Sequence, residues 1–448
     1  MDSSVQSRAA RQFCCLGLSK RNVRILIIGA TGFIGRALAT ELRRRGHQVV
    51  AASRQPASQA ETLQVDFAQV PPASWWLPRL AGIDAVVNAV GILREQRDQR
   101  FDALHTHAPV ELFLACVAAR VGIVIQVSAL GADEHAQSRY HLSKRAADEV
   151  LRTLALRGAI VQPSLVYDLG GESAGLFNKL ASLPVLALPR RGQVQVQPVH
   201  LSDVVDGIAA LLEAPPPSIQ TIAFAGPQPL SLREYLARLR KVLGWGRALV
   251  LPFPQALFVA MASVAGRVPG SFLDRETAGM LLRGNTAPAG PLQRLLGHPA
   301  RPVEAFLDKE QALAARTCAA LAIFLPLLRL GLALLWLWTA AVSLGLYPVQ
   351  ESYALLARVG LVGALATVAL YSAALIDLAL GVATLAAPAR WRRWVWAAQL
   401  ALIAGYTVLI SLFLPEYWLH PYGPISKNIP IIAAIALLWA LEPPSRRR

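Results

Sequence analysis

Cysteine is scarce in this chain. Its 448 residues include four cysteines, Cys14, Cys15, Cys116 and Cys318. Their spacings do not match the paired ligands of a metal site, and two adjacent cysteines are geometrically awkward for a disulfide framework. We therefore expect no metal site and a reducing compartment.

Acidic residues are also in deficit. The chain has 28 Asp and Glu residues against 44 Lys and Arg residues, which gives a formal net charge of +16. The basic residues are scattered and cluster beside apolar segments, as at Arg390, Arg392, Arg393 and Arg446 to Arg448. This placement favours membrane flanks over nucleic acid as the partner of the positive charge. Residues 1–22 lack both an apolar run and a small-residue cleavage site, so they predict a basic tail and not a signal peptide.

Apolar runs that could cross a bilayer are lacking before about residue 316. After it, residues 330–347, 359–387 and 394–414 approach or exceed the length of about 18 residues that a transmembrane helix needs. A fourth run, 429–441, is shorter and has Pro430 near its start. We expect a transmembrane domain of about four helices over residues 316–442, followed by a basic tail over 443–448.

The charged flanks of these runs predict the topology. Four spans would place Arg390, Arg392 and Arg393 on the same side as the N-terminal domain and the 446–448 tail, with Glu351 and His420 on the opposite side. The positive-inside rule then predicts a multi-pass membrane protein whose N-terminal domain and both termini are cytoplasmic.

Residues 23–220 alternate short apolar runs with helical patterns. The expected strands are residues 24–28, 48–52, 85–89, 123–128 and 159–162. This alternation is typical of an α/β fold in which helices cover both faces of a parallel sheet. Over residues 221–315 we expect a smaller substrate-side lobe and linker.

The order of elements loosens after Val199. We expect a helix over 203–213, a strand over 221–224 in the smaller lobe, and a helix over 231–243 capped by Ser231. Residues 251–266 are almost uncharged and predict one helix, either in the core or at an interface.

A glycine-rich loop directly follows the first expected strand. It reads Gly29-Ala30-Thr31-Gly32-Phe33-Ile34-Gly35 and opens a helical pattern. Such glycines let the backbone approach a pyrophosphate, and the free N–H groups at the start of the helix attract its charge. The order of strand, loop, helix and second strand predicts a dinucleotide site.

The end of the second strand bears on the choice of cofactor. Ser53 and Arg54 stand where an NAD-binding protein usually has a carboxylate for the ribose 2′-hydroxyl. Arg54, together with Arg36 beside the glycine loop, could instead pair with a 2′-phosphate. We expect NADP(H), with NAD(H) as the alternative and two solvated surface arginines as the plain structural reading.

Tyr140 and Lys144 lie four residues apart at the start of a helical pattern, so their side chains share one face. An ammonium group favours the phenolate of a neighbouring tyrosine and can also hold the cofactor ribose, so we expect Tyr140 and Lys144 to contact the cofactor. Tyr140 could then exchange a proton with a carbonyl or an alcohol during hydride transfer. Ser128, at the end of the fourth strand, could bind the substrate oxygen. A structural use of these three residues remains open.

These motifs resemble the extended and atypical short-chain dehydrogenase/reductases. The resemblance covers about residues 23–285 and is strongest to the branch that includes the nucleotide-binding accessory subunit of complex I. It rests on the glycine loop, Val65-Asp66-Phe67, Asn88-Ala89-Val90-Gly91, Ser128-Ala129-Leu130-Gly131, Tyr140-His141-Leu142-Ser143-Lys144, Pro163-Ser164-Leu165-Val166-Tyr167 and Val199-His200-Leu201-Ser202-Asp203-Val204.

The resemblance implies a Rossmann fold and further cofactor contacts. By it, Asp66 lies near the adenine, Ala89, Val90 and Gly91 line the cofactor, and Pro163, Ser164 and Leu165 approach the nicotinamide. From Arg329 onward the chain is similar to the DoxX-like four-helix membrane family. Arg329 and Asp377 are charges within or beside apolar helices, so each needs a partner or a cavity, and they are candidates to pair with each other.

The leading functional hypothesis is a membrane-anchored oxidoreductase that uses NADP(H) on a carbonyl, quinone-like or lipid substrate. A nucleotide-binding sensor or assembly factor of a membrane complex is the main alternative. Epimerisation of a lipid-linked sugar is the third. The lipid bilayer is the expected partner, and a membrane complex or a homo-oligomer is left open.

Overall fold

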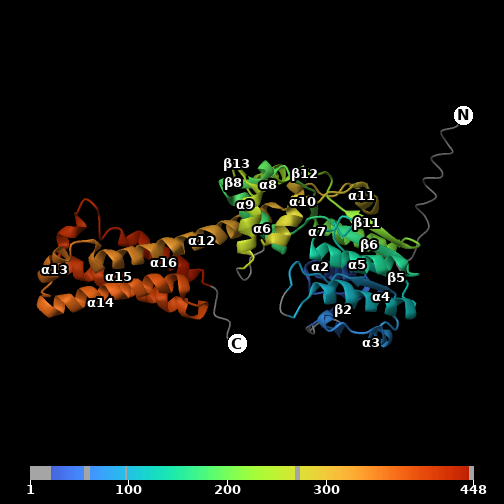
Figure 1. Ribbon diagram of the computed structural model, residues 1–448, viewed down its shortest axis with the longest axis horizontal. Coiled ribbons are helices and arrows are strands. Elements are labelled where there is room, and N and C mark those ends of the chain that lie inside the picture. The colour runs from blue at the N-terminus through green and yellow to red at the C-terminus, as the bar shows by residue number, and fades with distance from the viewer. Residues whose placement is uncertain (1–21, 55–60, 96–97, 268–272, 443–448) are drawn as a thin grey trace. The chain divides into compact units, whose positions relative to one another are not determined.

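The computed structural model describes residues 22–54, 61–95, 98–267 and 273–442. The predicted basic tails therefore lie outside the described residues, apart from Asn22. The chain divides into two compact units, Met1–Thr317 and Cys318–Arg448 (Figure 1). Each unit is described by itself.

The first unit is built on a seven-stranded parallel sheet with the strand order β11-β6-β5-β4-β1-β2-β3. The strands are β1 (Arg24–Ile28), β2 (Gln48–Ser53), β3 (Thr62–Gln64), β4 (Ala85–Asn88), β5 (Ile123–Val127), β6 (Gly158–Pro163) and β11 (Ile219–Phe224). The five strands expected from residues 23–220 are confirmed, and the α/β class with them.

Helices cover both faces of this sheet because its apolar side chains alternate. Ile25 and Ile27 of β1 pack with α2 (Phe33–Arg44) and α7 (Leu201–Glu213), whereas Leu26 and Ile28 pack with α4 (Ala108–Ala118) and α5 (Arg139–Thr153). The short α3 (Ala73–Trp76) and α11 (Gly290–Leu296) complete the two layers. A core on each face fixes the carboxyl ends of the strands along one edge.

One expected strand belongs to a different part of the fold. We predicted residues 221–224 as a strand of the smaller lobe, but β11 pairs in parallel with β6 and forms an edge of the main sheet. The sequence pattern of a short edge strand does not predict which strand it pairs with, because β11 pairs with residues about 60 positions away in the chain.

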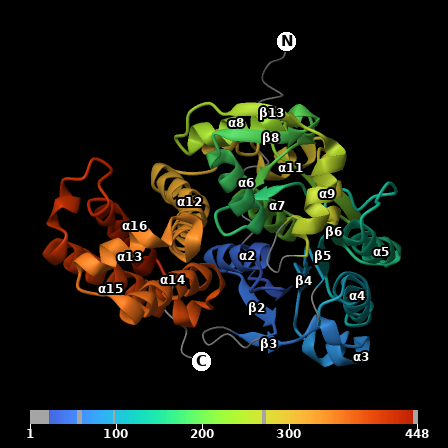
Figure 2. The ribbon, with the colours of Figure 1, turned by 60° about the vertical axis from the view of Figure 1, so that its left-hand side comes forward.

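The smaller lobe has its own core (Figure 2). Its helices are α6 (Glu172–Ser182), α8 (Leu232–Val242), α9 (Gln255–Ala265) and α10 (Arg275–Arg283). Its strands form two-stranded pairs, β8 (Val185–Pro189) with β13 (Leu249–Phe253) and β9 (Gln195–Val196) with β12 (Leu230–Ser231). β7 (Val166–Tyr167) and β10 (Val199–His200) form a third pair.

Two predictions in the lobe have different outcomes. Ser231 caps α8 in a reciprocal box with Glu234, as expected. The single helix expected over residues 251–266 is wrong at its start, because residues 251–253 belong to β13. Pro252 and Pro254 lack the backbone N–H that a helix interior needs, so the helix begins only at Gln255.

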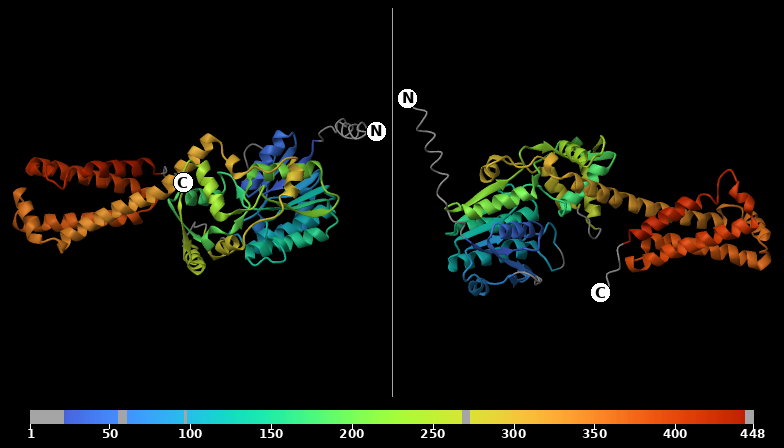
Figure 3. Two further views of the ribbon diagram at one scale, coloured as in Figure 1. Left: turned by 90° about the horizontal axis from the view of Figure 1, so that it is seen from above. Right: turned by 180° about the vertical axis from the view of Figure 1, so that it is seen from behind.

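The second unit is helical (Figure 3). It contains α13 (Val349–Arg358), α14 (Gly363–Ala386), α15 (Ala389–Phe413) and α16 (Asn428–Ala440), and the division between the units falls within α12 (Lys309–Ala341). Among the residues that the structure describes, three helical stretches are long and apolar enough to cross a membrane: Lys309–Leu346, Gly363–Ala386 and Ala389–Phe413. α16 is the shorter fourth apolar helix that the sequence predicts.

The expected pairing of Arg329 with Asp377 is wrong. Arg329 donates to Glu442 at 2.7 Å, whereas Asp377 Oδ1 has no hydrogen-bond partner among the described residues. Gly381 of α14 lies against Leu337 of α12, and Arg329 precedes Leu337 by more than two helical turns. At a rise of about 1.5 Å per residue, Arg329 lies far along α12 from this contact, whereas Asp377 lies only one turn from Gly381 on α14. The two charges are therefore at different depths along the helices.

Candidate active site

The glycine loop of residues 29–35 has the backbone that a pyrophosphate requires. Gly29 has a φ of +78°, which favours glycine, and a Cβ at Gly35 would lie 2.2 Å from the carbonyl oxygen of Gly29. α2 begins at Phe33, and Gly32 before it offers no side-chain cap. The first N–H groups of α2 are therefore not taken by a capping side chain, which is what an anion site needs.

The predicted cofactor residues lie along the carboxyl edge of the main sheet, since each group follows or ends a parallel strand. They are Gly29 to Arg36, Ser53 and Arg54, Asp66, Ala89 to Gly91, and Pro163 to Leu165. A dinucleotide binds at this edge in sheets of this topology. The residues present thus fit a dinucleotide cofactor.

Individual side chains in this set differ in what they contact. Arg36 and Arg54 are exposed, and the Arg54 guanidinium faces the Gln99 amide. The Asp66 carboxylate accepts from the N–H of Ala68 at 3.0 Å and so caps a short turn. Ser164 donates to the carbonyl of Gln197 at 2.5 Å, which links the end of β6 to the lobe side.

Ser128 and Lys144 form a buried cluster with Asp148. Ser128 Oγ donates to Asp148 Oδ2 at 2.5 Å. Lys144 Nζ donates to the carbonyls of Val90 at 2.8 Å and Val127 at 3.1 Å. Burial lowers the pKa of Lys144 and raises that of Asp148, since each charge leaves water. The Ser128 hydroxyl is therefore directed to Asp148 and the ammonium to the loop after β4.

Tyr140 lies on the first turn of α5 among aromatic rings. Its ring centroid is 5.5 Å from that of His105 and 6.1 Å from that of Phe101, both edge-on. Its backbone N–H donates to Glu276 of α10 at 2.8 Å, which ties α5 to the lobe. Burial raises the pKa of Tyr140 to about 12, so the phenol keeps its proton at neutral pH.

His105 connects the cofactor loop to the tyrosine helix, and the sequence reasoning missed it. Its Nε2 accepts from the N–H of Ile92 at 3.0 Å, and its Nδ1 lies 3.0 Å from Ser143 Oγ. Because Ser143 Oγ donates to the carbonyl of Tyr140, the proton of the neutral imidazole belongs on Nδ1. Burial, helped by the Lys144 charge, lowers the pKa of His105 to about 2.

A cavity of about 380 Å³ opens between the end of β5 and the smaller lobe. Leu130, Gly131 and Asp133 line it from the sheet side, and Arg190, residues 193–195 and residues 282–286 line it from the lobe. This volume is within the range of about 300–1,000 Å³ typical of small-molecule sites. The sequence pointed to a substrate-side lobe here but to none of the lining residues.

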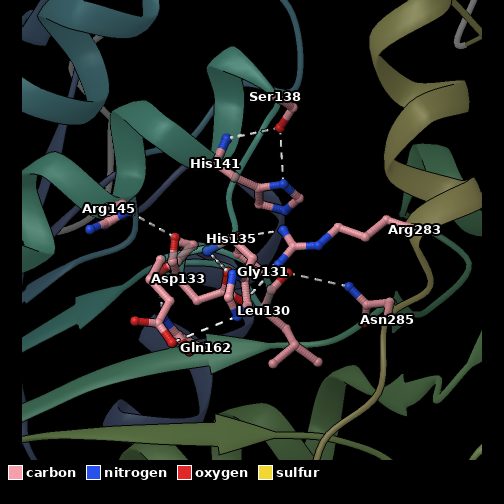
Figure 4. A network of polar contacts seen from close by, with 12 residues as sticks. Leu130, Gly131, Asp133, His135, Ser138, His141, Arg145, Gln162, Arg283 and Asn285 are labelled. Carbon is pink, nitrogen blue, oxygen red and sulfur yellow. Dashed lines mark hydrogen bonds and ion pairs between the residues drawn. The ribbon is translucent and has the colours of Figure 1, made fainter.

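Polar contacts hold the two walls of this cavity together (Figure 4). Arg283 donates to Asp133 at 2.6 and 2.9 Å and to the carbonyl of Gly131 at 2.9 Å. Asn285 contributes a buried Oδ1 with no hydrogen-bond partner among the described residues. His141, next to Tyr140, packs beside Gly131. Gly131, which lines the cavity, thus lies next to the first turn of α5, whose own residues are not part of the lining.

Comparisons with known proteins place both units. Residues 25–223 match the NAD dependent epimerase/dehydratase family, and residues 333–436 match the DoxX-like family. The chain joins an epimerase-like NAD(P)-binding domain to a DoxX-like domain.

Several relatives are similar to the epimerase-like domain. "NADH dehydrogenase [ubiquinone] 1 alpha subcomplex subunit 9, mitochondrial" of Arabidopsis thaliana is 30% identical over 255 residues, 52% of this chain and 61% of that protein. "Ceramide reductase" of Caulobacter vibrioides is 29% identical over 200 residues, 43% of this chain and 61% of that protein. The chain covers less than two thirds of the length of these curated relatives.

A solved structure bears on the fold alone. A nucleoside-diphosphate-sugar epimerase from Staphylococcus aureus superposes with a TM-score of 0.52 at 14% identity, over 63% of this chain and 99% of that one. This likeness agrees with the parallel sheet and lobe of the epimerase-like domain.

Proposed function

We propose that this protein is a membrane-anchored, NADP(H)-dependent oxidoreductase that acts on a carbonyl group of a lipid or quinone-like substrate. The observation that carries the proposal is the cavity beside Gly131, which opens between the end of β5 and the smaller lobe. The name of the Caulobacter relative, a reductase of a lipid, supports a lipid substrate class.

The residues of the site divide the work of such a reduction. The glycine loop and the start of α2 would hold the pyrophosphate, and Arg36 and Arg54 would pair with the 2′-phosphate. A cofactor held there would supply the hydride for the carbonyl carbon. Tyr140, kept protonated by burial, gives its proton to the carbonyl oxygen, and Lys144 holds the loop after β4 through the carbonyl of Val90. Ser128 takes part by holding Asp148 and, through it, α5, and its hydroxyl oxygen is the predicted contact of the substrate oxygen.

Replacing the tyrosine separates chemistry from binding. In Tyr140→Phe, we expect substrate-dependent NADPH oxidation to be lost while NADPH affinity is unchanged, because the ring stays and the proton donor goes. The assay uses purified protein with quinones, aldehydes and carbonyl-bearing lipids. Tyr422→Phe, at an exposed position of the DoxX-like unit, is the control. Undiminished turnover in Tyr140→Phe would remove Tyr140 from the mechanism.

The preference for NADP(H) has its own test. In Arg54→Gln, we expect NADPH affinity to fall about ten-fold or more while NADH affinity is unchanged, because a charge-assisted hydrogen bond to phosphate contributes about 1.5–3 kcal/mol. Arg43→Gln, exposed on α2, is the control. Binding of NADH ten times tighter than NADPH by the unsubstituted protein would overturn the proposal.

A nucleotide-binding subunit of a membrane complex is the second candidate. It is favoured because two predicted catalytic side chains make hydrogen bonds within the protein: Ser128 donates to Asp148, and Lys144 donates to backbone carbonyls. The names of the complex I relatives point the same way. Cofactor binding without turnover on any compound of the panel would select this candidate, and a matching set of co-purifying membrane proteins would identify its complex.

We further propose that the epimerase-like domain and both termini are cytoplasmic, with four spans in the DoxX-like unit. The proposal rests on Arg390, Arg392 and Arg393 beside the second and third apolar stretches. Protease protection of a C-terminal tag in oriented vesicles measures the side. A tag that is cut from the outside of intact cells would overturn it.

A further inference from the structure

Helix α9 of the lobe turns an apolar face to the surroundings. Leu257, Met261 and Val264 are 47%, 52% and 60% exposed and stand four and three residues apart, which places them on one side of the helix. On the other side, Phe258, Val259 and Ala262 pack toward the core of the lobe. α9 has no charged residue at all, so neither face is suited to water.

The strand pair before α9 repeats the pattern. In the β8–β13 register, Val185 stands beside Leu249 and the two are exposed, as is Leu251 opposite Ala187. Leu186 and Leu188, which alternate with these residues, lie in the core of the lobe. Both faces of this small sheet are therefore apolar, and exposed apolar residues in two consecutive elements mark an interaction surface.

The charges around this surface have one sign. Residues 173–202 and 245–267 contain no Asp or Glu. Arg190, Arg191, Arg247 and Arg267 all stand exposed at the ends of β8, β13 and α9. The acidic residues of α10, which packs on α9, are engaged elsewhere: Asp274 pairs with Arg94 and Glu276 accepts from Tyr140.

We propose that α9 and the β8–β13 pair, together with these four arginines, dock on the surface of an anionic phospholipid bilayer. An uncharged helix with basic flanks suits the interface between acyl chains and headgroups, where the arginines meet lipid phosphates. The chain itself supports the location. Arg316 at the end of this unit holds the lobe, with its guanidinium 4.3 Å from the Trp245 ring, and the first apolar stretch follows directly in the same helix.

Docking of this surface would also bring the cavity to the lipid. Arg190 lines the cavity, and its Nε donates to Gln255 at the first residue of α9 at 2.9 Å. A lipid that leaves the bilayer at α9 therefore meets the rim of the cavity without crossing water. This second step rests on the proposed function, whereas the docking does not.

The test compares two valines of the full chain in lipid nanodiscs. Cys14, Cys15 and Cys318 are replaced by Ser, leaving buried Cys116. An environment-sensitive fluorophore is then attached at Val264→Cys on α9, or at Val117→Cys, an exposed valine of α4, as the matched control. With phosphatidylglycerol and a phosphatidylcholine brominated in its upper acyl chain, we expect strong quenching at residue 264 and none at 117.

The arginines give the second arm of the experiment. In Arg247→Gln and in Arg267→Gln, we expect the equilibrium constant for docking to fall about five-fold each, since one basic side chain near an anionic surface contributes about 1 kcal/mol. Equal quenching at both valines would overturn the docking. A label at 264 that is shielded from aqueous iodide but not quenched by brominated lipid would overturn it in favour of a protein partner. Because no turnover is measured, these results stand apart from those of the Tyr140→Phe test.

Discussion

The two units of this protein place polar and apolar side chains in opposite ways. In the epimerase-like domain, the strands of the main sheet bury Ile and Val, and most charged residues face water, with Lys144 and Asp148 among the exceptions. In the DoxX-like unit, Leu365 and Val368 of α14 are about two-thirds exposed, while Asp377, Thr384 and Gln399 are buried. Only 17–33% of the residues in its three most apolar windows are buried.

The difference shows which solvent each unit meets. Water drives apolar side chains into a core, whereas acyl chains accept them on the outside and leave the helix contacts to small and polar groups. Gly381, whose Cα lies against Leu337, and the hydrogen bond of 2.7 Å from Gln399 to Thr384 are contacts of this second kind. Burial therefore indicates an apolar core in the epimerase-like domain, but contacts between helices through small and polar side chains in the DoxX-like unit.

Two buried carboxylates give the largest expected contrast. In Asp148→Ala, Lys144 loses its buried counter-charge and Ser128 its acceptor, so we expect the free energy of unfolding of the epimerase-like domain to fall by about 3–5 kcal/mol. In Asp377→Ala, no hydrogen bond is lost, and the thermal midpoint of the DoxX-like unit should stay the same or rise. Denaturant and thermal unfolding in detergent measure both. Equal losses of stability in the two variants would contradict the expected contrast between the two units.

Two glycines sharpen the contrast with one and the same substitution. Gly35→Ala places a Cβ 2.2 Å from the Gly29 carbonyl oxygen, so we expect a loss of about 1–3 kcal/mol in stability and a loss of dinucleotide affinity. Gly405→Ala on α15 has open space around its Cβ and should stabilise its helix by about 0.5–1 kcal/mol. Unchanged cofactor binding in Gly35→Ala would contradict the assignment of the loop.

Because of His105, we expect the stability of the epimerase-like domain to depend on pH in the acid range. Its folded-state pKa of about 2 lies below that of the unfolded chain, near 6.5, so the unfolded state takes up a proton first as the pH falls. We expect the epimerase-like domain to lose about 1.4 kcal/mol per pH unit below pH 6.5 from this residue. His105→Gln should remove that part of the slope in pH-dependent unfolding, and His298→Gln, on the surface, serves as the control. An unchanged slope in His105→Gln would show that His105 is not the cause.

Much of the fold was predictable because its signals are local. Five of the seven main strands, the capped helix α8 and the four apolar helices follow from periodicity and length, which need no knowledge of partners. Two short elements were predicted wrongly: β13, next to prolines, was expected to be helical, and the edge strand β11 was expected in the smaller lobe. Their pairing with β8 and β6 decides where they lie. Pairing across 60 residues leaves little trace in a local pattern.

The site divides in the same way. The glycine loop, Tyr140 and Lys144 could be found by their spacing, because the backbone geometry that they need is set within a few residues. His105 could have been noticed only as a histidine shortly after the fourth strand, and nothing in the residues near Arg283 or Asn285 predicts a cavity.

The dinucleotide loop, the parallel α/β order and the apolar helices could be predicted from local patterns alone, since each depends on neighbours along the chain. The tertiary structure alone decided that Ser128 bonds to Asp148, that Arg329 bonds to Glu442 and not to Asp377, and that α9 shows its apolar face outward. These three outcomes depend on which side chains, distant in the sequence, come to lie next to each other. Packing of the helices and strands decides this, and the periodicity of the sequence does not predict it.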